Sequence, residues 1–223
     1  MAWEGILRAL WIFLPAYLAN MAPVFVAKLV PSWSAPIDAG HVGKDGKRIL
    51  GAGKTWRGLA GGALLGGIMA LAMAWLAPHW GLIEGWDFGF NGYEYGAPVG
   101  RQAPCVGDPA DCSNYVVTEA WRVFLFGAVV GFMALVGDAV KSYFKRRTGR
   151  EGGAPWFPFD QLDFVIFGLL GFVLASALLP RGWVRHALTD DWLVLTTIVI
   201  LTPALHLLVN RIGFWLGLKK VPW

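Results

Sequence analysis

The stretch VFLFGAVVGFMALVGDAVKSYFKRR, residues 123–147, decides the class of fold, because an uncharged apolar run passes directly into a polar stripe. A membrane-spanning helix needs about 20 mostly apolar residues. The uncharged run from Val123 to Gly137 is short by that measure, but its helical character continues through Lys145. The stretch therefore predicts a transmembrane helix whose last turns carry polar chemistry.

Four further stretches are apolar enough to cross a bilayer. They cover about 7–29, 57–78, 161–180 and 191–214, and the stretch above gives a span at about 120–146. The first is too long for a cleavable signal peptide, so we expect it to be retained. The chain is 56% hydrophobic and only 15% charged, against about 25% charged residues in soluble domains. The sequence predicts an all-α integral membrane protein with five transmembrane helices in one domain, residues 1–223.

Loop charge predicts the orientation of these helices, because cytoplasmic loops carry an excess of Lys and Arg. The loops at about 30–56 and 147–160 and the C-terminal end are basic, whereas the loop at about 79–119 is acidic. We therefore expect the N-terminus outside, the C-terminus in the cytoplasm and the acidic loop outside. Its two cysteines, Cys105 and Cys112, could form a disulfide on an oxidising face or remain free thiols.

The polar stripe of the third span comprises Asp138, Lys141, Ser142 and Lys145, spaced so that they share one helix face. A charge at mid-membrane costs about 2.5–3.5 kcal/mol, so this face should meet protein, water or ligand rather than lipid. Lys145 and Arg146 could instead snorkel to the headgroups, but the short Asp138 and Ser142 side chains cannot. The stripe therefore indicates a functional polar face.

Two carboxylates, Asp160 and Asp163, follow a Gly- and Pro-rich turn at the start of the fourth span. Their spacing puts them on one helix face, where oxygen ligands can bind a divalent cation. The alternative is helix capping by Asp160, with Asp163 favoured by the helix dipole. With Asp138 facing them, three carboxylates beside a basic cluster predict a site for metal ions and phosphates together.

The first basic loop ends in RILGAGKTWRG, residues 48–58. Glycines followed by Lys, Thr and a helix start can present backbone N–H groups to a phosphate. A Walker A loop would need glycine at position 48, where this chain has Arg48, and no strand precedes the loop. A Gly-rich phosphate-binding loop remains, with a flexible loop for anionic lipid headgroups as the alternative.

Together these motifs resemble a known signature. Ser142-Tyr143-Phe144-Lys145-Arg146, a Gly- and Pro-containing loop and then Asp160-Gln161-Leu162-Asp163 resemble the CDP-alcohol-forming cytidylyltransferases. In the phosphatidate cytidylyltransferases of that group, Arg stands where this chain has Gln161, the loop is longer and a His-Gly-Gly portion is present. The short chain, the GAGKTWRG loop and five spans are more similar to the archaeal members, the CDP-archaeol synthases, over nearly the whole length.

The resemblance implies an enzyme of the cell membrane whose active site lies at the cytoplasmic face. Its substrates would be CTP and an isoprenoid ether-lipid phosphate, 2,3-bis-O-(geranylgeranyl)-sn-glycerol 1-phosphate, and its products a CDP-activated ether lipid and diphosphate, with Mg²⁺ as cofactor. A phosphomonoester has a second pKa of about 6, so its nucleophilic dianion needs no general base. No nucleic-acid-binding stripe is present, and the oligomeric state stays open.

On this resemblance we expect Asp138, Asp160 and Asp163 to bind the metal and, with Lys145, to form the catalytic set. Asp38 would either orient the first loop or contact the nucleotide. The expected substrate-binding residues are Asp38, Gly51, Gly53, Lys54, Thr55, Arg57, Lys141, Ser142, Arg146 and Gln161.

Two other classes of protein remain as alternatives. A CTP-dependent polyprenol kinase would transfer the γ-phosphate and release CDP. A non-enzymatic transporter or lipid-binding protein would need charged residues along a path across the membrane, whereas the charges here gather at one face.

Overall fold

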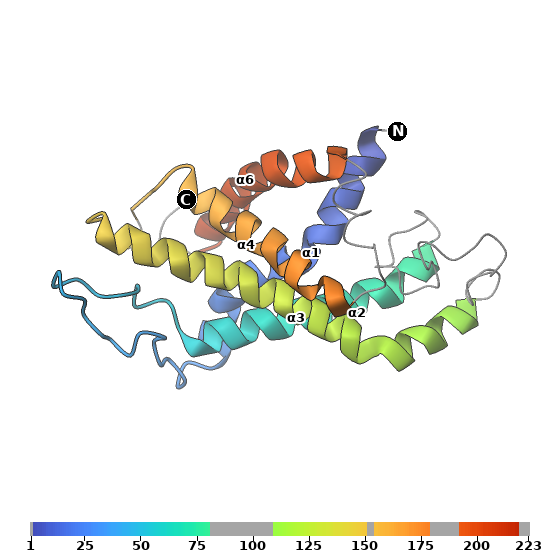
Figure 1. Ribbon diagram of the computed structural model, residues 1–223, viewed down its shortest axis with the longest axis horizontal. Coiled ribbons are helices and arrows are strands. Elements are labelled where there is room, and N and C mark those ends of the chain that lie inside the picture. The colour runs from blue at the N-terminus through green and yellow to red at the C-terminus, as the bar shows by residue number, and fades with distance from the viewer. Residues whose placement is uncertain (1, 81–108, 151–153, 179–191, 219–223) are drawn as a thin grey trace.

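The computed structural model describes residues 2–80, 109–150, 154–178 and 192–218, and the regular secondary structure in this part of the chain is helical (Figure 1). The elements are α1 (Ala2–Leu29), α2 (Trp56–Trp80), α3 (Pro109–Arg147), α4 (Phe159–Ala175), the 3₁₀ helix η1 (Ser176–Leu178) and α6 (Trp192–Trp215). Two isolated β-bridges occur in the loop between α1 and α2, but the described ranges contain no strand.

In the part of the chain that the structure describes, five helical segments are long and apolar enough to cross a membrane, which confirms for these residues the all-α fold with five apolar helices. They are Gly5–Leu29, Trp56–Leu76, Ala120–Arg147, Phe159–Leu178 and Trp192–Trp215. Helix α3 begins at Pro109, inside the stretch 79–119 that the sequence assigned to a loop. Cys105 and the side chain of Cys112 lie outside the described part, so their pairing stays a prediction.

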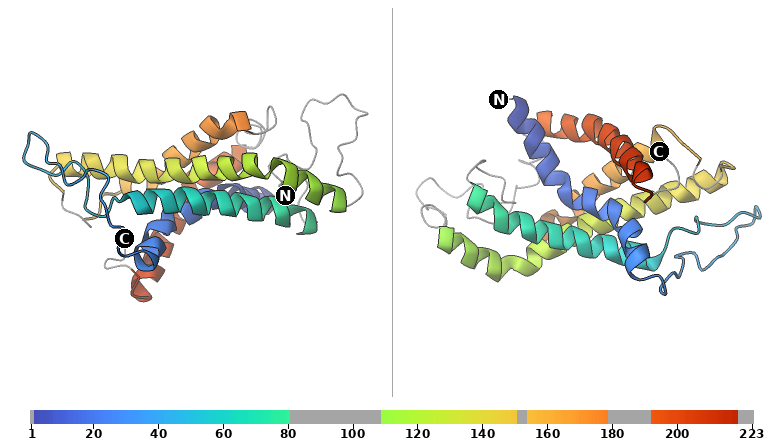
Figure 2. Two further views of the ribbon diagram at one scale, coloured as in Figure 1. Left: turned by 90° about the horizontal axis from the view of Figure 1, so that it is seen from below. Right: turned by 180° about the vertical axis from the view of Figure 1, so that it is seen from behind.

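Helices α2 and α3 run side by side, as both views in Figure 2 show. Glycines allow this close approach: a Cβ placed at Gly131 would lie 2.6 Å from the carbonyl oxygen of Gly62, and Gly66 and Gly127 meet in the same way. Small residues at helix–helix contacts are common in membranes because packing, rather than water exclusion, holds the helices together. The Gly-rich second span thus packs closely against a neighbour, as its sequence predicted.

An aromatic cluster joins the other helices to this pair. The ring of Phe172 on α4 stacks on Phe13 of α1 at 5.8 Å and meets Phe126 of α3 edge-on at 5.2 Å. All three side chains are fully buried, and offset or edge-on ring pairs contribute about 0.5–1.5 kcal/mol beyond burial. The cluster fixes α4 against α3, and therefore sets the position of the acidic first turn of α4.

Candidate active site

The first loop, residues 30–55, lies beside the C-terminal end of α3 (Figure 1). The backbone N–H of Gly51 donates to the Ser142 hydroxyl oxygen at 3.0 Å, and the Lys54 ammonium forms an ion pair with Asp138. These contacts bring the Gly-rich motif onto the polar stripe of α3, across a long separation in sequence.

A cavity of about 370 Å³, which we call the polar cavity, opens where this loop, α3 and α4 meet. Its lining residues are Gly51, Ala52, Gly53, Lys54, Asp138, Lys141, Ser142, Lys145, Arg146 and Asp160. All four members of the predicted stripe on α3 therefore face one space.

Within this region, the ammonium of Lys141 lies where three carboxylates converge. Its Nζ is 3.0 Å from an oxygen of Asp138, 2.9 Å from one of Asp163 and 3.5 Å from one of Asp160. The Lys141 side chain is 15% exposed and that of Asp163 only 6%. Because these charges are largely withdrawn from water, their attraction is screened much less than that of a surface pair.

Lys145 and Asp160 form a second ion pair between α3 and α4. The Lys145 Nζ lies 3.1 Å from each Asp160 oxygen, and the Trp156 backbone N–H donates to the same carboxylate at 2.6 Å. Lys145 is buried, so it does not snorkel outward. Asp160 is not the N-cap residue of α4, which is Pro158 and has no side-chain cap. The carboxylate instead tethers the preceding turn.

Asp38 holds the first loop together through hydrogen bonds and is not part of the cavity lining. Its carboxylate accepts hydrogen bonds from Arg48 Nη2 at 2.7 Å, from the Leu50 N–H at 2.9 Å and from the Gly40 N–H at 3.0 Å. Burial raises the pKa of Asp38, but these donors outweigh it and leave the pKa below its ordinary value. Of the two predicted roles, the contacts match orientation of the loop.

Three other expected substrate contacts lie away from the cavity lining. The Thr55 hydroxyl accepts the Gly58 N–H at 3.3 Å in the first turn of α2. Arg57 donates to the carbonyl oxygens of Val30 and Pro31 at 2.6 and 3.0 Å, just after α1. Gln161 is buried, and its Oε1 has no hydrogen-bond partner in the described ranges.

A basic pocket of about 420 Å³ adjoins the polar cavity and was not predicted. Its lining residues are Lys47, Arg48, Leu50, Gly51, Ala52, Arg146, Gly149 and Arg150. In the sequence, the outer cations of this pocket indicated only the orientation of the helices. Their clustering depends on the loop folding back onto the end of α3, which no spacing rule reveals.

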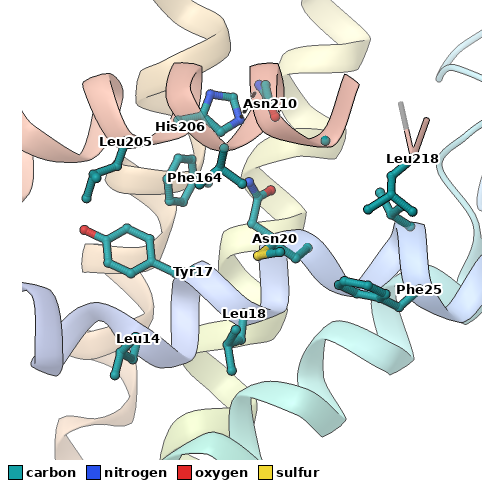
Figure 3. Close-up of a pocket in the computed structure, with 14 residues that line it drawn as sticks. Leu14, Tyr17, Leu18, Asn20, Phe25, Phe164, Leu205, His206, Asn210 and Leu218 are labelled. Carbon is teal, nitrogen blue, oxygen red and sulfur yellow. Dashed lines mark hydrogen bonds between the residues drawn. The ribbon is translucent and has the colours of Figure 1, made fainter. Parts of the chain in front are cut away.

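An apolar groove of about 300 Å³ lies on another side of α4, between α1 and α6. Figure 3 shows Tyr17 and Asn20 of α1, Phe164 of α4 and His206 and Asn210 of α6 around it. Phe164, which lines the groove, directly follows Asp163 in the sequence. Helix α4 therefore carries a carboxylate of the ion-pair cluster next to an apolar residue of the groove.

No group of three or more His, Cys, Asp or Glu side chains in the described part of the chain is arranged to hold a metal ion directly. The reason is visible in the geometry, since the three carboxylates converge on Lys141. Their chemistry nevertheless fits a hard cation, which prefers carboxylate oxygens. One oxygen of Asp163 is moreover buried and has no hydrogen-bond partner among the residues that the structure describes.

Comparison with known proteins adds independent information. The family model described as "CarS-like: CDP-archaeol synthase" matches residues 3–80 and 95–223. CDP-archaeol synthase from Halobacterium salinarum is 37% identical over 96% of this chain and 95% of its own length. That from Methanosarcina mazei is 36% identical over 94% and 99%, and that from Methanopyrus kandleri 34% over 100% and 96%. A solved intramembrane enzyme for archaeal membrane lipid biosynthesis aligns with TM-score 0.50 and 27% identity, covering 92% and 94% of the two chains.

Five helices able to cross a membrane and the likeness to a solved intramembrane enzyme define the class of this chain, a multi-pass membrane enzyme. Within that class, the chain belongs to the CDP-archaeol synthase family. It is thus a CTP-dependent cytidylyltransferase of lipid biosynthesis, which confirms the resemblance drawn from the sequence and sets aside the kinase and transporter classes.

Proposed function

We propose that the polar cavity is the active site, where CTP and 2,3-bis-O-(geranylgeranyl)-sn-glycerol 1-phosphate give a CDP-activated ether lipid and diphosphate. One observation carries this proposal: four cations from the loop and α3 line a single cavity beside the carboxylates of α3 and α4. These cations are Lys54, Lys141, Lys145 and Arg146. Together they offer the positive charge needed to hold a triphosphate and a lipid phosphate near each other.

The reaction needs positioning more than proton transfer. A non-bridging oxygen of the lipid phosphate attacks the α-phosphorus of CTP, and a new P–O bond forms. The bond from the α-phosphorus to the bridging oxygen breaks, and its electrons leave with diphosphate. Since the attacking phosphate is already a dianion near neutral pH, the protein's task is to align two polyanions and stabilise the leaving charge.

Lys54, Lys145 and Arg146 are the residues we assign to the phosphates. Gly51 has a different role, because its lack of a side chain lets the loop lie close to α3. A Cβ there would lie 3.1 Å from the Ser142 Oγ and 3.2 Å from Arg146 Nη2. A side chain at position 51 would therefore push the loop away from the two groups that border the cavity.

Asp138, Asp160 and Asp163 are the residues that would hold Mg²⁺. Bound there, the ion would neutralise phosphate charge and stabilise the leaving diphosphate. Two observations support this assignment: a buried oxygen of Asp163 has no partner in the described ranges, and the three carboxylates approach one another around Lys141. The Lys141 ammonium lies between these three carboxylates, so it must take another position when the ion is bound.

One isoprenoid tail of the lipid would lie in the apolar groove between α1, α4 and α6. Keeping hydrocarbon out of water stabilises the complex by about 0.8 kcal/mol per CH₂ group. Because Phe164 adjoins Asp163 in the chain, a lipid in the groove would bring its phosphate toward the end of α4 that carries the carboxylates.

We further infer that the polar cavity faces the cytoplasm, with the N-terminus outside and the C-terminus inside. The basic residues of the first loop and of the end of α3, Lys47, Arg48, Arg147 and Arg150 among them, gather beside the cavity. Such an excess of Lys and Arg is typical of cytoplasmic loops. This orientation gives the cavity access to nucleotide.

The test is a reconstituted assay with the full chain in detergent micelles. Diphosphate and CDP-lipid should appear only when CTP, the ether-lipid phosphate and Mg²⁺ are all present. Asp163→Asn should lower turnover by about a hundred- to a thousandfold, since it removes a cation ligand from the site where charge is stabilised. Release of CDP instead of diphosphate, or no turnover by folded protein, would refute the proposal.

Asp45→Asn is the matched control for Asp163→Asn. Asp45 is 37% exposed and forms an ion pair with Arg147 at the outer side of the loop. Exposed pairs contribute about 0.2–1 kcal/mol, so this variant should stay within a few-fold of wild type. A similar loss in both variants would mean that loop docking, and not the carboxylate cluster, limits turnover.

A further inference from the structure

The proposed reaction leaves the position of the Lys141 ammonium unexplained. Lys141 lines the polar cavity, yet its ammonium pairs with the carboxylates of both α3 and α4, which binding of phosphate alone would not require. It lies within 3.5 Å of Asp138, Asp160 and Asp163. One ammonium thus fills the point that a shared cation would otherwise occupy.

The three carboxylates differ in how much they depend on this lysine. Asp138 is also paired with Lys54, and Asp160 with Lys145. Among the residues that the structure describes, Asp163 has Lys141 as its one cation, and its other oxygen has no partner. A carboxylate so withdrawn from water strongly favours a nearby positive charge. Asp163 therefore retains a cation at this point, whether ammonium or metal.

We propose that Lys141 occupies the divalent-cation position in the nucleotide-free enzyme and leaves it when CTP binds. The inference rests on the proposed function, because it takes the three carboxylates as the metal ligands. An ammonium and a divalent ion cannot share one ligand set, since like charges at such short range repel strongly. Metal can enter only after Lys141 has found another anion.

The triphosphate of CTP supplies that anion. Lys141 lines the polar cavity as well as touching the carboxylates, and its four-carbon stem allows the ammonium to turn toward the cavity without backbone movement. Nucleotide binding then frees the carboxylates, and the metal neutralises them. By reciprocity, metal and nucleotide each strengthen binding of the other, and the free enzyme has low affinity for metal.

The first test measures Mn²⁺ binding to the full chain in detergent by electron paramagnetic resonance, without nucleotide. Lys141→Met should bind Mn²⁺ about tenfold or more tightly than wild type, within the usual range of coupling between two ligands. Lys141→Arg keeps the charge and should remain as weak as wild type. Lys145→Met is the matched control, because Lys145 pairs with Asp160 and not with Asp163, and it should change Mn²⁺ affinity much less.

A second measurement guards against a variant that is poorly folded. In Lys141→Met the carboxylate of Asp163 has lost its cation, so Mn²⁺ should raise the thermal unfolding midpoint of this variant markedly. A ligand that binds only the folded state stabilises that state. Wild type should show little change at the same Mn²⁺ concentrations. Equal affinity for Mn²⁺ in wild type and Lys141→Met, or equal thermal shifts, overturns the inference.

One further variant separates failure of this inference from failure of the proposed metal site. Asp163→Asn added to Lys141→Met should weaken Mn²⁺ binding. If it has no effect, the metal does not bind at these carboxylates, and both proposals fall. If Asp163→Asn weakens binding in both backgrounds but Lys141→Met is no tighter than wild type, only the role of Lys141 is overturned.

Discussion

Asp38→Asn tests whether one buried carboxylate holds the first loop over the polar cavity. The Asp38 side chain is 1% exposed and accepts three hydrogen bonds, from Arg48, Leu50 and Gly40. An amide keeps one acceptor oxygen and turns an NH₂ group toward a former donor. Losing a hydrogen bond to a charged group costs about 1.5–3 kcal/mol. We expect a cost near 3 kcal/mol, which is roughly a hundredfold in the equilibrium for local opening of the loop.

Hydrogen exchange with mass spectrometry measures this opening directly. Peptides from residues 37–54 should exchange about a hundredfold faster in Asp38→Asn, while peptides from α2 and α4 stay unchanged. The KM for CTP should rise, because Gly51 and Lys54 at the end of the loop border the polar cavity. The control is Asp45→Asn, which replaces an acid at an exposed position in the same loop. This variant should leave hydrogen exchange of the loop near that of wild type.

One result would refute the reasoning: wild-type exchange in the loop together with lost CTP binding, since Asp38 would then contact the nucleotide itself.

The pH dependence of loop protection gives a second check on Asp38. The folded pKa of Asp38 is lowered, so its stabilisation is complete above the ordinary carboxyl pKa of about 4 and is lost as the pH falls through the lower folded value. Protection of the loop should stay constant from about pH 7 to 5 and decline only in stronger acid, and Asp38→Asn should not show that decline.

Three further predictions concern packing and residues outside the cavity. Gly127→Ala puts a Cβ against Gly66 of α2 and should destabilise the protein by about 1–3 kcal/mol in detergent unfolding; a loss no larger than that of the outward-facing Leu125→Ala would contradict this. Tyr17→Phe removes the 2.6 Å hydrogen bond to Thr202 and should cost about 0.6–1.7 kcal/mol, with no additional loss in the double variant with Thr202→Val. Arg57→Met should lower the unfolding midpoint and leave the KM for CTP unchanged, because Arg57 binds carbonyl groups at the end of α1; a raised KM at an unchanged midpoint would restore it as a substrate contact.

The sequence predicted which residues of α3 face the candidate site better than it predicted the contacts that individual side chains make. The stripe Asp138, Lys141, Ser142 and Lys145 follows from helical periodicity, and these side chains do face one cavity. The expected roles of Thr55 and Arg57 rested on their place in a Gly-rich motif. Their actual contacts are with backbone groups at helix ends. The short Thr55 side chain finds a local partner in the first turn of α2, whereas Arg57 reaches the carbonyl groups after α1, and the motif reveals neither contact.

The sequence by itself determined that this is a membrane protein of five apolar helices, and it predicted that the basic loops lie at one end of them. That much follows from span length and composition, which depend on the bilayer and not on how the helices pack. The tertiary structure decided which charge meets which. Lys141 has three carboxylates within 3.5 Å because the aromatic cluster fixes α4 against α3. The sequence marked three acids as a metal site, whereas the distances between helices made one lysine their common partner.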